Sequence, residues 1–162
     1  MENEVEIVFL WFESVKPDIL QFYPTERIDH RAIWASTVFR NIIRGIQEEN
    51  ELAIKLGCKL IIDDPFRIPF GKIDKSKIGR ALKTKASLIK TKDRKLIIKK
   101  VIKFLRNGIA PQEVKVYCKL IKKFGVEEFI KEISNIKTEN KYVIQLKKYL
   151  LNNTFAKRPY KK

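Results

Sequence analysis

The sequence predicts a mainly helical protein, and three observations support this fold class. Apolar residues recur at steps of three and four over 29–44, 94–106 and 111–124, which is the spacing of the buried face of an α-helix. Glycine or proline stands at an end of each of these segments, as is typical of helix boundaries. The 162 residues are 44% hydrophobic, which is enough to bury a core. We therefore expect a compact helical domain with at most a small β-hairpin near residues 60–70.

The same spacing places helices along most of the chain. We expect them at residues 5–15, 29–44, 47–56, 74–91, 94–106, 111–124, 126–133 and 138–151. Asp29 and Asp93 are the expected N-caps of two of them, because a short carboxylate accepts hydrogen bonds from the first free amides. Gly45, Gly57 and Gly125 are expected to end the helices that precede them.

Strands are expected only near residues 60–70. Residues 60–62 and 66–68 are apolar, and the Asp-Asp-Pro sequence between them is typical of a turn. We expect residues 1–152 to form one nucleic-acid-binding domain, for which subdomains 1–58 and 74–152 are an alternative. Residues 153–162 are expected to form a flexible basic tail, since they have few apolar side chains to bury. Its cations are Lys157, Arg158, Lys161 and Lys162.

Positive charge is concentrated in one stretch of the chain. The formal net charge is +16, and residues 66–106 hold 15 Lys or Arg against 2 Asp, whereas residues 1–65 hold 7 basic and 12 acidic residues. Charge needed only for solubility would be spread more evenly. This concentration predicts a polyanionic partner, for which DNA and RNA are the main candidates.

Other classes of protein are disfavoured by the composition. No stretch approaches the roughly 20 apolar residues of a membrane-spanning helix, and the acidic N-terminus is unlike a secretory signal. We therefore expect a cytoplasmic, nucleoid-associated protein. Cys58 and Cys118 are the only cysteines and His30 the only histidine, so we expect buried thiols and neither a metal site nor a cofactor.

Catalytic residues are not evident. Asp63 and Asp64 are adjacent, and in a strand they would point to opposite sides instead of converging on a metal ion. His30 has no nearby nucleophile, and a capping or surface role is expected for it. No glycine pattern of a phosphate-binding loop is present. We therefore expect a protein that is not an enzyme.

The segment 67–80 is the first candidate binding site. Arg67 lies between apolar residues and Pro69 restricts the backbone, so the guanidinium is expected to be held in a fixed direction. Several donors follow that would converge on a phosphate, although a structural hairpin with solvated lysines is an equal alternative. The predicted contacts are Arg67, Lys72, Lys75, Ser76, Lys77 and Arg80.

The second candidate site is a row of cations at helical spacing. It consists of Lys95, Lys99, Lys103 and Arg106. A solvated helix face normally alternates charge, and matching glutamates are missing from this segment. The row therefore predicts contacts with a phosphate backbone, without readout of bases.

Residues 67–71, Arg-Ile-Pro-Phe-Gly, followed by Lys72, Lys75 and Ser76, resemble a motif in the C-terminal domain of the archaeal and eukaryotic primase large subunit. That motif reads Arg-apolar-Pro-aromatic-small and then basic-Lys-Ser/Thr-Gly, and here the last glycine is displaced to Gly79. Most members hold an iron–sulfur cluster on four cysteines, and this chain has two. The sequence resembles the cluster-free, PriX-like non-catalytic subunit of archaeal DNA primase. The resemblance implies template or nucleotide contacts at Arg67, Lys72 and Lys75.

We therefore expect an accessory, non-catalytic subunit of a DNA primase. It would bind single-stranded or primer-template DNA, or RNA, and support primer synthesis by separate catalytic and large subunits. A sequence-independent structural protein of chromatin or a virion is the main alternative, and a small nuclease that uses Asp63 or Asp64 is a further one. A protein partner is expected to dock on the acidic N-terminal third through Trp11, Phe12, Trp34 and Phe39.

Overall fold

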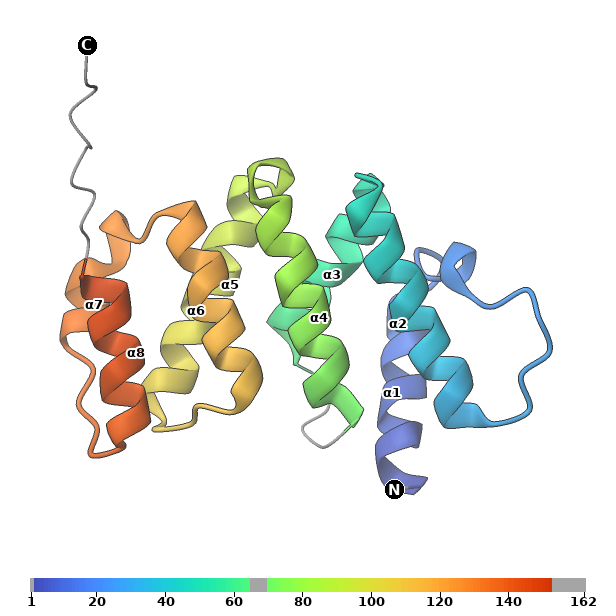
Figure 1. The fold of residues 1–162 in the computed structure, drawn as a ribbon, viewed down its shortest axis with the longest axis horizontal. Helices are drawn as coiled ribbons and strands as arrows, with labels where there is room; N and C mark the ends of the chain where they lie inside the picture. Colours follow the sequence, from blue (N-terminus) through green and yellow to red (C-terminus); the bar gives the residue numbers. More distant parts are fainter. Residues whose placement is uncertain (1, 65–69, 153–162) are drawn as a thin grey trace, which may run out of the picture.

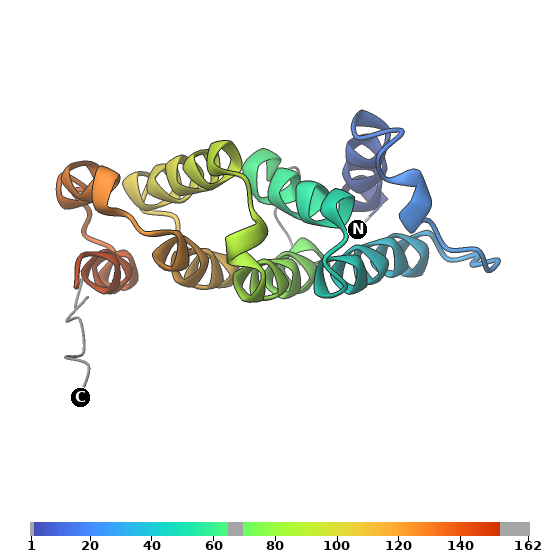
Figure 2. The same ribbon diagram turned by 90° about the horizontal axis from the view of Figure 1, so that it is seen from above.

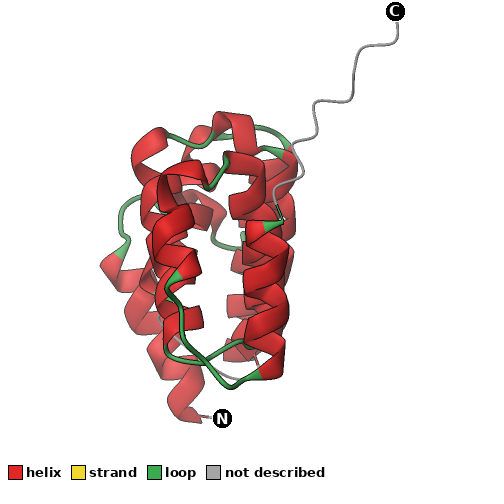
Figure 3. Ribbon diagram, turned by 90° about the vertical axis from the view of Figure 1, so that its left-hand side faces the viewer, coloured by secondary structure: helices red, strands yellow, loops and turns green. Residues whose placement is uncertain are grey.

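The computed structural model describes residues 2–64 and 70–152, and the side chains of residues 4–64 and 73–152. The described chain is helical and contains no strand (Figure 3), so the predicted fold class is confirmed. Its α-helices are α1 (Glu2–Ser14), α2 (Arg31–Gln47), α3 (Glu51–Asp63), α4 (Phe70–Thr84), α5 (Thr91–Arg106), α6 (Gln112–Phe124), α7 (Ile130–Ser134) and α8 (Lys141–Leu151). Three short 3-10 helices connect them, η1 (Leu20–Phe22), η2 (Ala86–Leu88) and η3 (Glu127–Phe129).

The helices lie in two layers. Helices α2, α4, α6 and α8 stand side by side and form the front layer, which is nearest the viewer in Figure 1 and the lower row in Figure 2. Helices α1, α3, α5 and α7 form the back layer. Successive helices thus alternate between the layers, as in α-solenoids built from stacked helical hairpins. Helices of one layer therefore come from segments that are far apart in the sequence.

The core lies between the two layers and is continuous from Val8 in α1 to Leu150 in α8. Each helix buries the apolar stripe that faces the other layer, as with Ile42 in α2 and Ile78 in α4, exposed by 1% and 0%. The alternative subdomain boundary at residue 58 falls inside α3. No helix in the described part of the chain is long and apolar enough to span a bilayer.

Gly45 and Gly57 lie inside α2 and α3, so the prediction that they end helices was wrong. A Cβ on Gly45 would lie 2.6 Å from the Cβ of Ala53, and one on Gly57 would lie 2.9 Å from Cδ1 of Ile46. The two glycines therefore let neighbouring helices approach closely. Gly125, with a φ of 88°, does end α6 as predicted.

The strand predicted at residues 60–62 was also wrong, because α3 continues to Asp63. Leu60 and Ile61 are buried at 1% and 0% exposure and continue the helix face of Leu56. A short apolar run is ambiguous between strand and helix when the element is buried on more than one side. The other strand of the predicted hairpin, at 66–68, lies outside the described residues.

The predicted N-caps differ from those in the structure. Asp29 precedes the α2 cap position, which is His30, and its carboxylate accepts a hydrogen bond from Arg27 Nε at 2.8 Å. Asp93 lies in the first turn of α5 instead of before it. There its negative charge still faces the positive end of the helix dipole.

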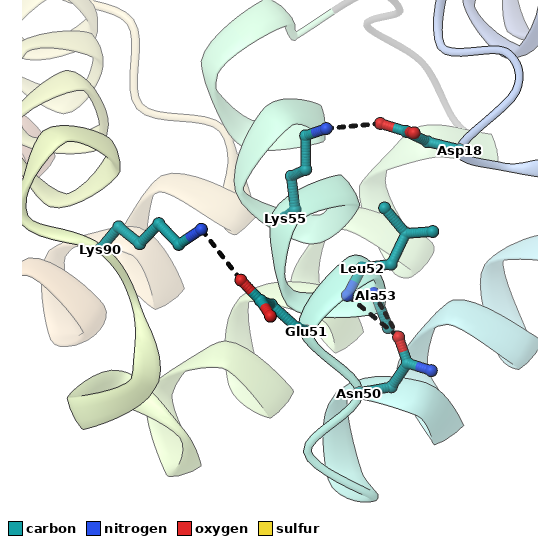
Figure 4. Close-up of polar contacts among 7 residues, drawn as sticks. All are labelled: Asp18, Asn50, Glu51, Leu52, Ala53, Lys55 and Lys90. Atoms are coloured by element: carbon teal, nitrogen blue, oxygen red, sulfur yellow. Dashed lines mark hydrogen bonds and ion pairs between the residues drawn. The ribbon is translucent and has the colours of Figure 1, made fainter.

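Asn50 caps α3 (Figure 4). Its side-chain oxygen accepts hydrogen bonds from the backbone amides of Leu52 and Ala53, both at 3.0 Å. Asn140 caps α8 in the same way. Both residues satisfy amides that have no partner within their helices.

Ion pairs connect α3 to the segments on either side of it (Figure 4). Lys55 Nζ lies 2.6 Å from a carboxylate oxygen of Asp18, and Lys90 Nζ lies 2.9 Å from Glu51. These pairs are largely exposed, so each contributes little to stability. These ion pairs do, however, neutralise the positive charges of Lys55 and Lys90.

Aromatic side chains pack α1 onto α2. Phe12 and Phe39 are fully buried with ring centroids 5.3 Å apart, and Trp34 stacks on Phe9 at 5.3 Å. Trp11 is 5% exposed, and its Nε1 donates a hydrogen bond to Asp63 at 2.9 Å. The aromatic residues expected to receive a protein partner are thus used in the packing of the protein itself.

Candidate nucleic-acid interface

Two of the predicted contacts have no described position. Arg67 lies outside the described residues, and Lys72 lies in the first turn of α4, where side chains are not described. The remaining predicted residues fall into three groups that the fold separates.

Lys75 and Ser76 are buried, so the prediction that they contact nucleic acid from the surface was wrong. Lys75 is 0% exposed and its ammonium pairs with the carboxylate of Asp64, while Ser76 is 6% exposed. Helix α4 packs against α2, α3 and α6, so most of its circumference faces other helices. Only one narrow stripe of α4 remains in contact with solvent.

Further polar groups lie in the interior near this ion pair. Glu113 and Tyr117 of α6 are 3% and 0% exposed. Burial raises the pKa of Tyr117 well above its usual value, and the negative charges of Glu113 and Asp64 raise it further. This cluster is internal, so it does not add to a binding surface.

Lys77 and Arg80 are exposed, as predicted for contacts. They lie on the solvent stripe of α4, which also carries Ile73 and Thr84 at helical spacing. This stripe belongs to the front layer (Figure 1).

The row on α5 is exposed but belongs to the back layer, so it does not extend the stripe of α4. Glutamates from later in the chain pair with two of its members. Lys95 Nζ lies 3.1 Å from Glu128, and an Arg106 guanidinium nitrogen lies 3.3 Å from Glu132. Glutamates from outside the segment therefore pair with half of the row, whose other members are Lys99 and Lys103.

The front layer carries an exposed basic surface that includes residues not predicted from the sequence. Each of its four helices turns one stripe to solvent, and each stripe carries cations. We call this surface the front face. Its nine exposed cations are Arg40 and Arg44 of α2, Lys77 and Arg80 of α4, Lys115, Lys119 and Lys123 of α6, and Lys141 and Lys148 of α8. Arg31, at the start of α2, is also exposed, but it pairs with Glu6 of α1 at 3.1 Å and is not part of this face.

No carboxylate of the described front-layer helices is exposed. Helices α2 and α8 contain no Asp or Glu, and the carboxylates of α4 and α6 are Asp74 and Glu113, which are 7% and 3% exposed. None of the nine cations forms an ion pair with a described residue, whereas several cations of the back layer do. The front face therefore presents charge of one sign to solvent.

Asp74 lies under the front face between α2 and α4. Ser36 Oγ of α2 donates a hydrogen bond to its carboxylate at 3.3 Å. Burial raises the pKa of Asp74, while the positive charges of Lys77 and Arg40 act in the opposite direction. Arg40 of α2 and Lys77 of α4 thus both lie near the Asp74 carboxylate, where these two helices are in contact.

A local reading of charge missed most of the front face. The residues 66–106 run through α4 and α5 and so cross both layers. A better signal was the spacing within each helix, because Lys115, Lys119 and Lys123 recur every four residues and all but one of the residues between them are apolar. What the sequence did not contain was the side-by-side placement of alternate helices.

The carboxylates that a nuclease would use already have partners. Asp63 accepts the hydrogen bond from Trp11 and lies 3.0 Å from Lys59 Nζ, and Asp64 pairs with Lys75. Among the described side chains, no group of three or more His, Cys, Asp or Glu is placed to hold a metal ion.

The two cysteines are buried, as expected. Both are free thiols, and burial raises the pKa of Cys58 and of Cys118 to about 12. Neither thiol is therefore activated as a nucleophile.

The fold and the front face define a helical protein of stacked hairpins with a basic front face. Comparison of the chain with protein-family models, with curated proteins and with solved structures gave no match.

Proposed function

We propose that the protein binds nucleic acid through phosphate groups, without reading base sequence, and that the front face is the contact surface. One observation carries this proposal. Four helices from distant parts of the chain align their solvent stripes, and these stripes carry nine exposed cations and no exposed carboxylate. Cations kept unpaired on one surface repel one another, so a bound polyanion would relieve that repulsion.

Phosphate contact fits this surface better than base readout. Lysine and arginine at helical spacing reach phosphates along a backbone and release the counterions condensed on it. No helix projects from the front layer to enter a groove, because all four lie side by side (Figure 1). The contacts would therefore position the protein without sequence information.

The proposed biological setting is a DNA primase, in which this chain would be a non-catalytic accessory subunit. The support is the resemblance of residues 67–76 to the motif of the primase large subunit. In this setting the front face would hold the template or primer while separate catalytic and large subunits make the primer. Arg67 and Lys72 would contribute further contacts.

A structural nucleic-acid-binding protein, of chromatin or a virion, is the second candidate, and one observation favours it. Lys75 and Ser76 are buried, which removes two residues of the primase resemblance from the surface. The front face does not depend on that resemblance. Binding of nucleic acid is thus common to both candidates, and only the partner enzyme separates them.

Charge reversal on the front face tests the binding surface. We expect Lys77→Glu with Arg80→Glu to lower affinity for a labelled DNA duplex at least tenfold in fluorescence anisotropy. The matched control is Lys131→Glu with Lys137→Glu, which changes the net charge equally at two exposed lysines outside the front face. Equal losses in the two variants would mean that net charge alone drives binding, and would remove the front face from the proposal.

Co-purification tests the setting. A primase subunit should be recovered in stoichiometric complex with catalytic and large subunits, and Arg67→Ala should reduce primer synthesis by that complex without unfolding the chain. Recovery of nucleic acid without these subunits would favour the structural protein. Metal-stimulated cleavage of DNA that Asp63→Asn abolishes would point to a nuclease.

A further inference from the structure

The cationic stripes of the front face carry one aromatic side chain, Tyr149 of α8, and Lys122 Nζ covers its ring. The other side chains between the cations are aliphatic or polar, such as Ile33 and Thr37 in α2, Ile73 in α4 and Gln145 in α8. Proteins that hold single strands without sequence preference combine cations with aromatic rings on which unpaired bases stack. The front face offers the cations without an uncovered ring among its described side chains.

Aromatic rings of the described side chains are otherwise packed or covered. Tyr149 is the one exposed by more than about a third, at 38%, and Lys122 Nζ covers its ring at 4.0 Å from the centroid. Tyr23 packs edge-on against Trp34, with ring centroids 4.6 Å apart.

The dimensions of the front face suit a stiff rod. Its four helices lie side by side (Figures 1 and 2), and packed helices stand about 8–10 Å apart, so the row is roughly 24–30 Å wide. One turn of a DNA duplex is about 34 Å long. A duplex keeps its phosphates in a fixed array over this distance, whereas a flexible strand must be ordered on binding.

From these features we infer that the front face binds double-stranded nucleic acid in preference to a single strand. This inference rests on the proposed function and makes it more specific. The duplex supplies a preordered array of phosphates to the nine cations, and its bases stay paired and stacked, so the face needs no rings. In a primase the ligand would be the paired primer-template region, and in a structural protein it would be the duplex itself.

The test compares a DNA duplex of about two turns with one of its strands alone, by fluorescence anisotropy of the full chain over a series of KCl concentrations. We expect the duplex to bind at least tenfold more tightly near physiological salt. Its log Kobs should fall linearly with log salt concentration, by about 0.9 for each phosphate neutralised.

Variants show whether the preference comes from the front face. Lys115→Glu with Lys119→Glu should weaken duplex binding at least tenfold and reduce the salt slope by about 2, since two phosphate contacts are lost. The control, Lys131→Glu with Lys137→Glu, substitutes two exposed lysines outside the front face and should leave the slope near the wild-type value. Circular dichroism and thermal melting check that each variant is folded.

The outcomes separate this inference from the proposed function. Equal or tighter binding of the single strand, weakened by the front-face variant, would overturn the preference for a duplex and keep the binding surface. Binding of neither probe, or a front-face variant that binds as wild type, would overturn the proposed function itself.

Discussion

The ion pair between Lys75 and Asp64 allows a test of whether Lys75 of α4 is a buried structural residue, whereas Lys77 of the same helix is a surface contact. Lys75→Met removes the ammonium and keeps a long apolar side chain in the same space. The carboxylate of Asp64, whose side chain is 12% exposed, would then lose this partner while staying largely shielded from water. We expect the free energy of unfolding to fall by about 3–5 kcal/mol, as when one partner of a buried pair is removed.

The size of this loss follows from burial. An exposed ion pair is worth about 0–1 kcal/mol because water screens it, and water has little access to Lys75, which is 0% exposed. Native proteins are stable by only about 5–15 kcal/mol, so the substitution should remove a large part of the total. Adding Asp64→Asn should recover part of the loss, since a neutral amide then replaces the carboxylate that was left without its ammonium partner. Asparagine also tolerates the left-handed backbone at this position, where φ is 46°.

The assay is urea denaturation followed by far-ultraviolet circular dichroism at pH 7, applied to the wild type, both single variants and the double variant. The double-mutant cycle then gives the coupling energy between the two side chains. The matched control is Lys77→Met, two residues further along α4, where the side chain is exposed. Its stability should lie within about 0.5 kcal/mol of the wild type.

Lys75→Met should lose more stability than Lys77→Met, but Lys77→Met should lose more affinity for nucleic acid. Lys77→Met should weaken duplex binding, and Lys75→Met should bind as wild type under conditions where it is folded. The reasoning is refuted if Lys75→Met unfolds at the wild-type urea concentration and binds duplex more weakly. Lys75 would then act as the surface contact that the primase resemblance implies.

Three further predictions concern buried groups and a helix cap. Cys58 and Cys118, whose pKa burial raises to about 12, should react with a thiol reagent at pH 8 only after urea unfolds the chain. Burial raises the pKa of Asp74, so the folded state binds the carboxyl proton more tightly than the unfolded state does. The stability that this proton contributes is present at low pH and is lost as pH rises from the unfolded-state pKa through the folded-state pKa. The urea midpoint of Asp74→Asn should therefore lack this pH dependence. Asn50→Ala should cost about 0.5–2 kcal/mol in thermal or urea unfolding, because two amides lose their cap.

Helices with clear periodicity and boundary residues could be predicted from the sequence. The helix predicted at 94–106 corresponds to α5, and the one predicted after Pro111 corresponds to α6, which ends at Gly125 as expected. In these segments the local pattern and the tertiary environment agree, because each helix buries one stripe and exposes the other.

Predictions failed where tertiary contacts override local rules. Gly45 and Gly57 were predicted to end helices because glycine is typical of helix ends. Instead they lie inside helices, where α2, α3 and α4 approach too closely for a side chain. Residues 60–62 resemble a strand, yet they complete a helix that is buried on several sides. Neither outcome can be derived from propensities, since both depend on segments that are distant in sequence.

Two residues of the candidate site also show that tertiary contacts decide what the sequence leaves open. Lys75 and Lys77 look equivalent in the sequence, but successive residues of a helix are about 100° apart, so residues two apart point in very different directions. The neighbours of α4 bury the first and leave the second in solvent. The sequence gives the number of cations, and the packing of the helices determines which of them are exposed and can bind a ligand.

The sequence by itself determined that this chain is helical and strongly cationic, because both properties are sums over local residues. Only the tertiary structure decided that cations of α2, α4, α6 and α8 share one face while those of α5 lie on the other layer. The physical reason is that a helix exposes whichever stripe its neighbours leave uncovered, and those neighbours come from elsewhere in the chain.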